Sequence, residues 1–237
     1  MWPENAIDID PKLYPDVARD IAELTVKTKT PLIAGVVLNQ NGVPANASVM
    51  YSIGGEVASS YVKRGLTPFG EYMPLRKLAE FFSPYAASVV DFQSGYTLQT
   101  HKVAGVDLGP IICYEIINDR LVDEMSSKSE ALILQTNSAT FSGTPESRQQ
   151  LAISRIRAKE NSRSILSVST IGISAFIDNN GRVLSATDEN IQSSLVGQLL
   201  LNHELTPANK WCIPSKLIVL ALFLGIGVIE IRRQRSK

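Results

Sequence analysis

Short apolar runs rich in β-branched residues alternate with longer mixed segments between about residues 1 and 205, and this alternation is the strongest constraint on the fold. Leu32–Leu38 (LIAGVVL) and Ala131–Thr136 (ALILQT) have the length and apolar character of buried strands. Asp16–Lys29 and Glu146–Arg163 carry apolar residues at helical spacing, which predicts helices. Strands and helices in alternation predict an α/β layered domain.

Turn signals divide the rest of this region into further short elements. Gly54-Gly55 separates two β-branched runs, Ala47–Ile53 and Glu56–Val62, and predicts a hairpin. Five more strands are expected, at Thr97–Val103, Val106–Cys113, Ser164–Ser169, Ile173–Ile177 and Arg182–Ser185. Two short helices are expected, from Pro74 to about Phe82 and from a cap at Asp119 to about Ser127.

Composition excludes several classes of function. The 23 basic and 23 acidic residues give a formal net charge of zero, so charge offers no case for nucleic-acid binding. The two cysteines, Cys113 and Cys212, are too few for a disulfide framework, which favours a free thiol. His101 and His203 lie far apart, and no cluster has metal-ligand spacing. We therefore expect neither a metal nor a cofactor.

The C-terminal segment Leu217–Ile229 carries no charged or polar side chain. A helix that is apolar all round is buried either in protein or in lipid. The basic cluster Arg232–Lys237 that follows favours the cytoplasmic side of a membrane. We expect a linker at 206–216, a transmembrane helix at 217–231 and a cytoplasmic tail at 232–237; a core helix of a soluble domain is the alternative.

Three residues with reactive side chains, Glu4, Lys63 and Cys113, are each expected at the end of a strand. Cys113 follows an apolar strand and precedes a helical segment, which is where α/β folds present ligand-binding residues. Taken alone, a cysteine is usually a buried structural residue, and a lysine or glutamate is usually solvated. The motifs around the three residues, and not any one residue alone, favour a catalytic role for them.

Three motifs in order carry a resemblance to a known family. They are Trp2-Pro3-Glu4, the run from Lys63 through Pro68-Phe69-Gly70-Glu71-Tyr72-Met73-Pro74, and Ile112-Cys113-Tyr114-Glu115. Together they resemble the nitrilase superfamily, and the second resembles its apolipoprotein N-acyltransferase branch in particular. Later stretches around Gln149–Glu160 and Gly172–Asp178 are similar to the same branch, so the resemblance covers roughly residues 1 to 205.

The resemblance implies a nitrilase-like four-layer αββα sandwich followed by one C-terminal transmembrane helix. It assigns Glu4 as general base, Lys63 as the cation that stabilises the oxyanion, and Cys113 as nucleophile. Glu71 matches a second essential glutamate of the family. Tyr114 and Glu115 match positions beside the nucleophile.

The implied reaction is the transfer of a fatty acyl chain in two steps. Cys113 takes the chain from a phospholipid as a thioester, and the α-amino group of the diacylglyceryl-cysteine at an apolipoprotein N-terminus then accepts it. The expected location is the inner membrane of a bacterium, with the catalytic domain on the extracytoplasmic side and the C-terminus in the cytoplasm. Phospholipid, apolipoprotein and membrane are therefore the expected partners.

The sequence also departs from the family. Full-length members carry transmembrane helices before this domain, and the start at Trp2-Pro3-Glu4 lacks most of the strand that should deliver Glu4, so we expect a domain truncated at its N-terminus. Asn137–Phe141 and Thr170–Gly172 differ from the usual family sequence near the substrate cleft. Two alternatives stay open: an amidase acting on a small C–N substrate, and an inactive membrane-anchored fragment.

Overall fold

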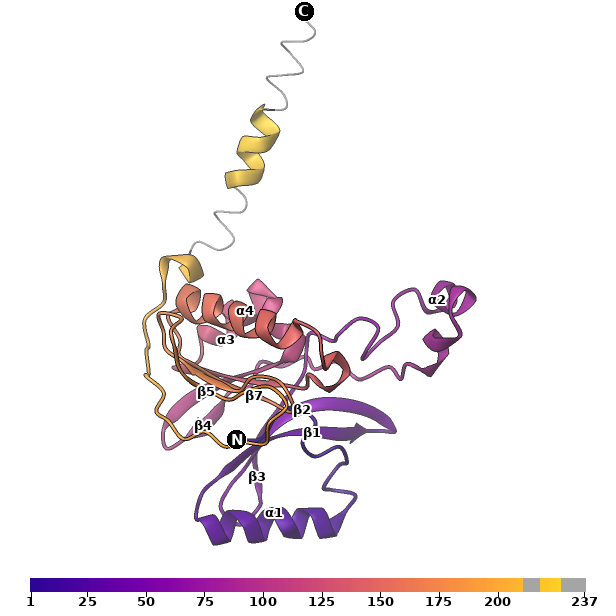
Figure 1. Cartoon of the computed structure of the whole chain (residues 1–237), viewed down its shortest axis with the longest axis vertical. Coiled ribbons are helices and arrows are strands. Elements are labelled where there is room, and N and C mark those ends of the chain that lie inside the picture. The colour runs from indigo at the N-terminus through magenta and orange to yellow at the C-terminus, as the bar shows by residue number, and fades with distance from the viewer. Residues whose placement is uncertain (211–217, 227–237) are drawn as a thin grey trace, which may run out of the picture.

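The computed structural model describes residues 1–210 and 218–226 and contains two β-sheets stacked between helices (Figure 1). One sheet is antiparallel and has the order β1 (Leu32–Gln40), β2 (Val43–Tyr51), β3 (Val57–Val62). Helix α1 (Pro15–Thr28) covers its outer face. Asn41 and Gly42 have φ angles of 55° and 88°, which allows a tight turn between β1 and β2.

The N-terminal residues extend the edge of this sheet. The backbone N–H of Trp2 donates to Ile33 O at 2.8 Å, and Gly35 N–H donates to Pro3 O at 3.1 Å. Ile7 then forms a parallel bridge with Val36. This short segment therefore runs along β1, and Glu4 lies between its two points of attachment.

The second sheet has six strands in chain order. They are β4 (His101–Val103), β5 (Val106–Ile112), β6 (Ala131–Thr136), β7 (Ile165–Ser169), β8 (Ala175–Ile177) and β9 (Val183–Ala186). The β5–β6 and β6–β7 pairs are parallel, and the other pairs are antiparallel. Helices α3 (Asp119–Ser126) and α4 (Glu146–Asn161) make the two crossovers, while 3₁₀ turns η2 (Cys113–Ile117) and η3 (Ala139–Phe141) follow β5 and β6.

Three apolar layers hold the elements together. The first lies between α1 and the antiparallel sheet, and the third lies between the six-stranded sheet and helices α3 and α4. The middle layer joins the two sheets through Ile33, Met50 and Ile133. Alternation along a strand sends neighbouring side chains to opposite faces, so Ile133 enters the middle layer while Leu132 and Leu134 face the helices. All six residues of β6 are buried, as a strand covered on both faces requires.

An arm projects from the sandwich between Glu71 and Phe92 (Figure 1). It contains α2 (Arg76–Phe82) and the 3₁₀ turn η1 (Pro84–Ser88). Arg76 closes the arm on itself through its contacts with Val89 O at 2.9 Å and the Asp91 carboxylate at 2.6 Å. The base of the arm is closed by Phe92 N–H, which donates to Glu71 O at 2.7 Å.

The structure confirms the predicted α/β domain and differs from the predicted elements in detail. The strand expected at Thr97–Val103 is reduced to the three residues of β4. Asn118, and not Asp119, caps α3, because Asp119 is already helical while Asn118 Oδ1 accepts from Leu121 N–H at 3.1 Å. β2 begins at Val43, before the predicted Ala47, because its first residues pair with the end of β1.

The transmembrane helix predicted near the C-terminus lies only partly within the described residues. Residues 218–226 are helical, whereas residues 211–217 and 227–237 lie outside the described part of the chain. No helix in that described part has both the length and the apolar character that crossing a membrane requires. The described helix is thus shorter than the transmembrane helix predicted at 217–231.

Candidate active site

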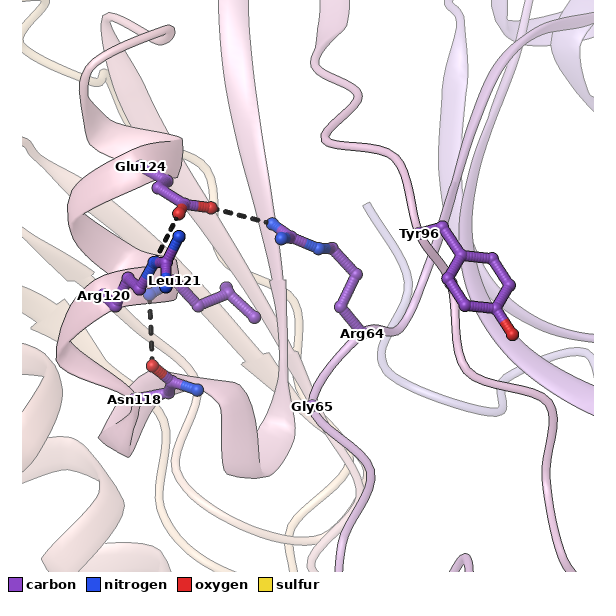
Figure 2. Close-up of a pocket in the computed structure, with 8 residues that line it drawn as sticks. Arg64, Gly65, Tyr96, Asn118, Arg120, Leu121 and Glu124 are labelled. Carbon is purple, nitrogen blue, oxygen red and sulfur yellow. Dashed lines mark hydrogen bonds and ion pairs between the residues drawn. The ribbon is translucent and has the colours of Figure 1, made fainter.

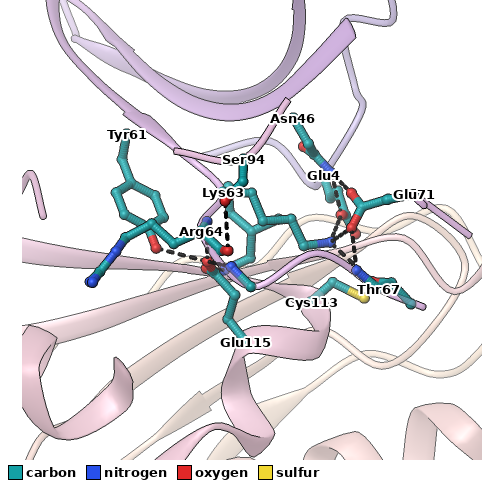
Figure 3. A network of polar contacts seen from close by, with 12 residues as sticks. Glu4, Asn46, Tyr61, Lys63, Arg64, Thr67, Glu71, Ser94, Cys113 and Glu115 are labelled. Carbon is teal, nitrogen blue, oxygen red and sulfur yellow. Dashed lines mark hydrogen bonds and ion pairs between the residues drawn. The ribbon is translucent and has the colours of Figure 1, made fainter. Parts of the chain in front are cut away.

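A buried lysine between two buried glutamates forms the centre of the candidate site (Figure 3). Lys63 directly follows β3 and is 1% exposed. Its Nζ lies 3.1 Å from Glu4 Oε1 and 2.8 Å from Glu71 Oε2. The third N–H of the ammonium group has Thr67 Oγ1 as acceptor, at 3.3 Å. The end of β3, the N-terminal segment and the base of the arm therefore meet at one charged cluster.

Asn46 on β2 joins the two carboxylates, and the sequence reasoning did not assign it to the site. Its Nδ2 donates to Glu4 Oε1 at 2.6 Å and to Glu71 Oε1 at 3.0 Å. Asn46 is 1% exposed, within a strand whose neighbouring residues are also buried. A polar amide in a strand made mostly of apolar residues is the signal that could have identified it, because buried amides need partners.

The two glutamates differ in their acid–base character. Burial raises the pKa of Glu4, the charge of Glu71 raises it further, and Lys63 opposes both. Burial would also raise the pKa of Glu71, but Lys63 and donors from Asn46 and the Thr67 backbone lower it. Burial would lower the pKa of Lys63, but the two carboxylates raise it. Glu4 is thus the carboxylate suited to accept a proton, while Glu71 stays ionised and holds the ammonium group.

Cys113 presents its thiol to this cluster from the end of β5 (Figure 3). Its φ of 48° is in the left-handed region, which is unfavourable for a residue with a side chain and tends to occur at functional sites. Burial raises the pKa of the half-buried thiol to about 12, and the negative charge of Glu4 adds to this, whereas Lys63 lowers it. The resting thiol is therefore neutral and needs a base.

Glu115 ties the strand that carries Lys63 to the turn that carries Cys113. Its Oε1 accepts from Tyr61 OH at 2.8 Å and from the backbone N–H groups of Arg64 and Gly65 at 2.7 and 3.0 Å. Its Oε2 accepts from Ile112 N–H at 2.8 Å. Glu115 is fully buried, and burial raises its pKa against the effect of these donors. The sequence reasoning missed Tyr61, whose partner lies 54 residues away.

The remaining residues around Cys113 come from its own turn and from α4. Tyr114, directly after Cys113, is 41% exposed. Gln150 Nε2 on α4 approaches Cys113 Sγ at 4.0 Å, a contact that the sequence reasoning did not predict. The two departures from the family sequence meet nearby, because Thr170 Oγ1 donates to Asn137 Oδ1 at 2.8 Å.

Two cavities lie beside the cluster, and Cys113 lines neither of them. One, of about 400 Å³, opens next to Arg64, where Arg64 and Arg120 both pair with Glu124 (Figure 2). The other, of about 760 Å³, lies between Trp2, β7 and residues 187–195. The paired charges of the first tie the end of β3 to α3.

The other titratable residues singled out in the sequence lie elsewhere. His101 is buried between two serines, and His203 lies 3.5 Å from Glu130. Within residues 1–210 and 218–226, no three His, Cys, Asp or Glu side chains gather in a way that would hold a metal ion. Cys212 lies outside the described residues.

Known proteins are similar to this chain in sequence and in fold. A model of the carbon–nitrogen hydrolase family matches residues 2–203. The apolipoprotein N-acyltransferase of Mycolicibacterium smegmatis is 33% identical over an alignment of 239 positions, which covers 98% of this chain and 40% of that protein. That of Pseudomonas paraeruginosa is 28% identical over 96% of this chain and 46% of its own length. The chain therefore spans less than half the length of these relatives.

Solved structures show the same fold at lower identity. A carbon–nitrogen hydrolase from Helicobacter pylori superposes with a TM-score of 0.57 at 17% identity, covering 75% of this chain and 65% of that one. An amidase from Nesterenkonia sp. has a TM-score of 0.57 at 16% identity, covering 76% of this chain and 65% of that one. These likenesses concern the arrangement of the sheets and helices.

Proposed function

The chain belongs to the carbon–nitrogen hydrolase family, and from this premise we propose that it carries the acyl-transfer chemistry of an apolipoprotein N-acyltransferase. The observation that carries the proposal is the buried Glu4–Lys63–Glu71 cluster facing the strained Cys113. The substrates would be a phospholipid and the N-terminal diacylglyceryl-cysteine of an apolipoprotein. The site would work at the extracytoplasmic face of a bacterial inner membrane.

The first half-reaction acylates the enzyme. Glu4 takes the thiol proton of Cys113, and the thiolate attacks the ester carbonyl carbon of the phospholipid. The Lys63 ammonium group and the backbone N–H of Tyr114 would stabilise the resulting oxyanion, because the first N–H groups of a turn lack partners inside it. Collapse breaks the C–O bond, and Glu4 returns its proton to the leaving lysophospholipid.

The second half-reaction transfers the acyl chain to nitrogen. The α-amino group of the acceptor attacks the thioester carbonyl carbon, and the same donors stabilise the second oxyanion. Collapse breaks the C–S bond, leaves an amide and restores the Cys113 thiol. Glu71 would keep Lys63 charged and in place through both halves, and Glu115 would hold the distance between Lys63 and Cys113 constant.

The projecting arm favours a lipid substrate over a small soluble amide. Its surface exposes Leu75, Phe81, Phe82 and Tyr85 at 78%, 82%, 76% and 82%. A patch of exposed aromatic side chains on a projecting segment is suited to contact with lipid. Because the arm begins at Glu71, lipid bound along it would lie next to the catalytic cluster. A small-substrate amidase would share the cluster but would have no use for such a surface.

The arm can be tested apart from the chemistry. The double substitution Phe81→Ser, Phe82→Ser is expected to weaken binding to phospholipid vesicles in a flotation assay, while acylation from detergent-dispersed lipid persists. Val196→Ser, at a residue that is 97% exposed outside the arm, is the matched control. Equal vesicle binding by both variants would favour the amidase.

The thioester tests the proposed function directly. The detergent-solubilised protein is incubated with phospholipids of mixed head group, and its intact mass is measured. We expect a gain of one fatty acyl group that maps to Cys113, is released by hydroxylamine and is absent from Cys113→Ala. A protein that forms no such adduct but hydrolyses small amides would establish the amidase, and a protein that does neither would support the inactive fragment.

A further inference from the structure

The first two turns of α4 face the nucleophile. Gln150 Nε2 lies 4.0 Å from Cys113 Sγ, and Leu151 packs against the same apolar cluster as the cysteine. Glu146, the first residue of α4, precedes Gln150 by four positions, so the two side chains leave the same face of the helix. The negative charge of Glu146 is near enough to contribute to the raised pKa of the Cys113 thiol.

One oxygen of the Glu146 carboxylate has no hydrogen-bond partner among the residues that the structure describes. This oxygen, Oε2, is also inaccessible to solvent. A buried carboxylate oxygen without a donor is costly, so its presence calls for an explanation. The nearby cation Arg148 is directed elsewhere, since its Nε pairs with Glu189 at 3.4 Å. The acceptor capacity of Glu146 is therefore open to a ligand that carries N–H donors.

The second half-reaction leaves one proton that neither Glu4 nor the Cys113 sulfur keeps. An α-amino group has a pKa near ~8 and reaches the site largely as an ammonium ion, which is not a nucleophile. Conversion of that ammonium group to an amide N–H releases two protons from the nitrogen, and the Cys113 sulfur takes back only one. Glu4 can carry the proton that returns to sulfur. The other proton needs an acceptor on the side from which the amine arrives.

We propose that Glu146 binds the ammonium group of the acyl acceptor and accepts its first proton, so that α4 forms the amine subsite of the active site. This inference rests on the proposed acyl transfer. The freed lone pair forms the N–C bond at the thioester carbonyl, the C–S bond breaks, and the second nitrogen proton passes through Glu4 to the sulfur. Glu146, which is partly exposed as a residue, then releases its proton to water.

The test separates the two half-reactions in Glu146→Gln, which keeps the size of the side chain and removes its charge. The variant and the wild type are first acylated with phospholipid, and then given a peptide with an N-terminal diacylglyceryl-cysteine. We expect the Cys113 thioester to form at the wild-type rate and its transfer to the peptide to slow by about 10²-fold or more, the typical contribution of a general base. Glu23→Gln, on the exposed face of α1, is the control.

Hydroxylamine supplies the decisive comparison, because its nitrogen is uncharged at neutral pH and needs no prior deprotonation. We expect hydroxylamine to cleave the thioester of Glu146→Gln as fast as that of the wild type, and Glu146→Asp, which keeps the charge, to retain part of the peptide transfer. A Glu146→Gln variant that transfers to the peptide at the wild-type rate overturns the inference. The inference is also overturned if hydroxylamine cleaves the thioester of Glu146→Gln as slowly as the peptide does, or if Glu146→Gln forms the thioester more slowly than the wild type. A wild type that forms no thioester would instead overturn the proposed function.

Discussion

We expect the folded chain to lose stability between pH 6.5 and pH 4 because of the buried His101. The imidazole is fully buried on β4, with Nε2 at 2.9 Å from Ser48 Oγ on β2 and Nδ1 at 2.6 Å from Ser59 Oγ on β3. It therefore joins the two sheets as a neutral ring. Burial lowers the pKa of His101 from its ordinary 6.5 to about 4, since a charged ring would lose its hydration.

The size of the effect follows from this difference in pKa. Below pH 6.5 the unfolded chain binds a proton at His101, while the folded chain does so only near pH 4. The stability associated with the neutral ring is thus fully present above pH 6.5 and is lost as the pH falls toward 4. At about 1.36 kcal/mol for each unit of pKa, the loss is about 3 kcal/mol.

Urea unfolding at a series of pH values measures this loss against a matched variant. His101→Gln cannot titrate but can still hydrogen-bond to the two serines. Glu4 and Glu115, whose pKa values burial raises, respond to acid in the opposite sense, but they are common to both proteins and cancel in the difference. The wild type should lose about 3 kcal/mol more than the variant between pH 6.5 and pH 4. Parallel curves for the two proteins would refute the reasoning.

Three further substitutions, together with one control variant, test the site and its surroundings. Lys63→Met should slow thioester formation, followed by intact mass, by roughly 10²–10³-fold, because an oxyanion donor is lost and the Cys113 thiol becomes harder to ionise. Glu115→Gln should lower the free energy of unfolding by roughly 2–4 kcal/mol in urea, since an amide N–H₂ would face backbone donors, and should slow acylation as well. Gly172→Ala should destabilise the fold by about 1–3 kcal/mol, because the added Cβ would lie 2.6 Å from Ser147 Oγ and 2.7 Å from Ser169 Oγ. Gly70→Ala, whose new Cβ would meet nothing closer than 3.7 Å, is the control and should be close to neutral when both glycine variants are compared by urea unfolding.

The sequence was sufficient for most elements because burial leaves a periodic pattern along the chain. The first four residues of β6, 131–134, form an apolar run because the strand is covered on both faces, and Asn41-Gly42 supplies the positive φ angles of the β1–β2 turn. The roles of Asn46 and Tyr61 left no comparable pattern. Their partners lie 42 and 54 residues away, so a contact between distant segments, which no local periodicity encodes, decides what they do.

The features that lower the stability of the folded chain are concentrated at one place, which argues for a function there. Two carboxylates and an ammonium group are buried together, although ion pairs of this kind often contribute less to stability than apolar residues of the same size. The unfavourable φ of Cys113 lies beside them, and Glu115 accepts four hydrogen bonds to hold the two strand ends in register. A chain selected only for stability would avoid such a cluster. Its persistence is explained if Glu4 must accept a proton, Lys63 must stay charged, and Cys113 must remain within reach of both.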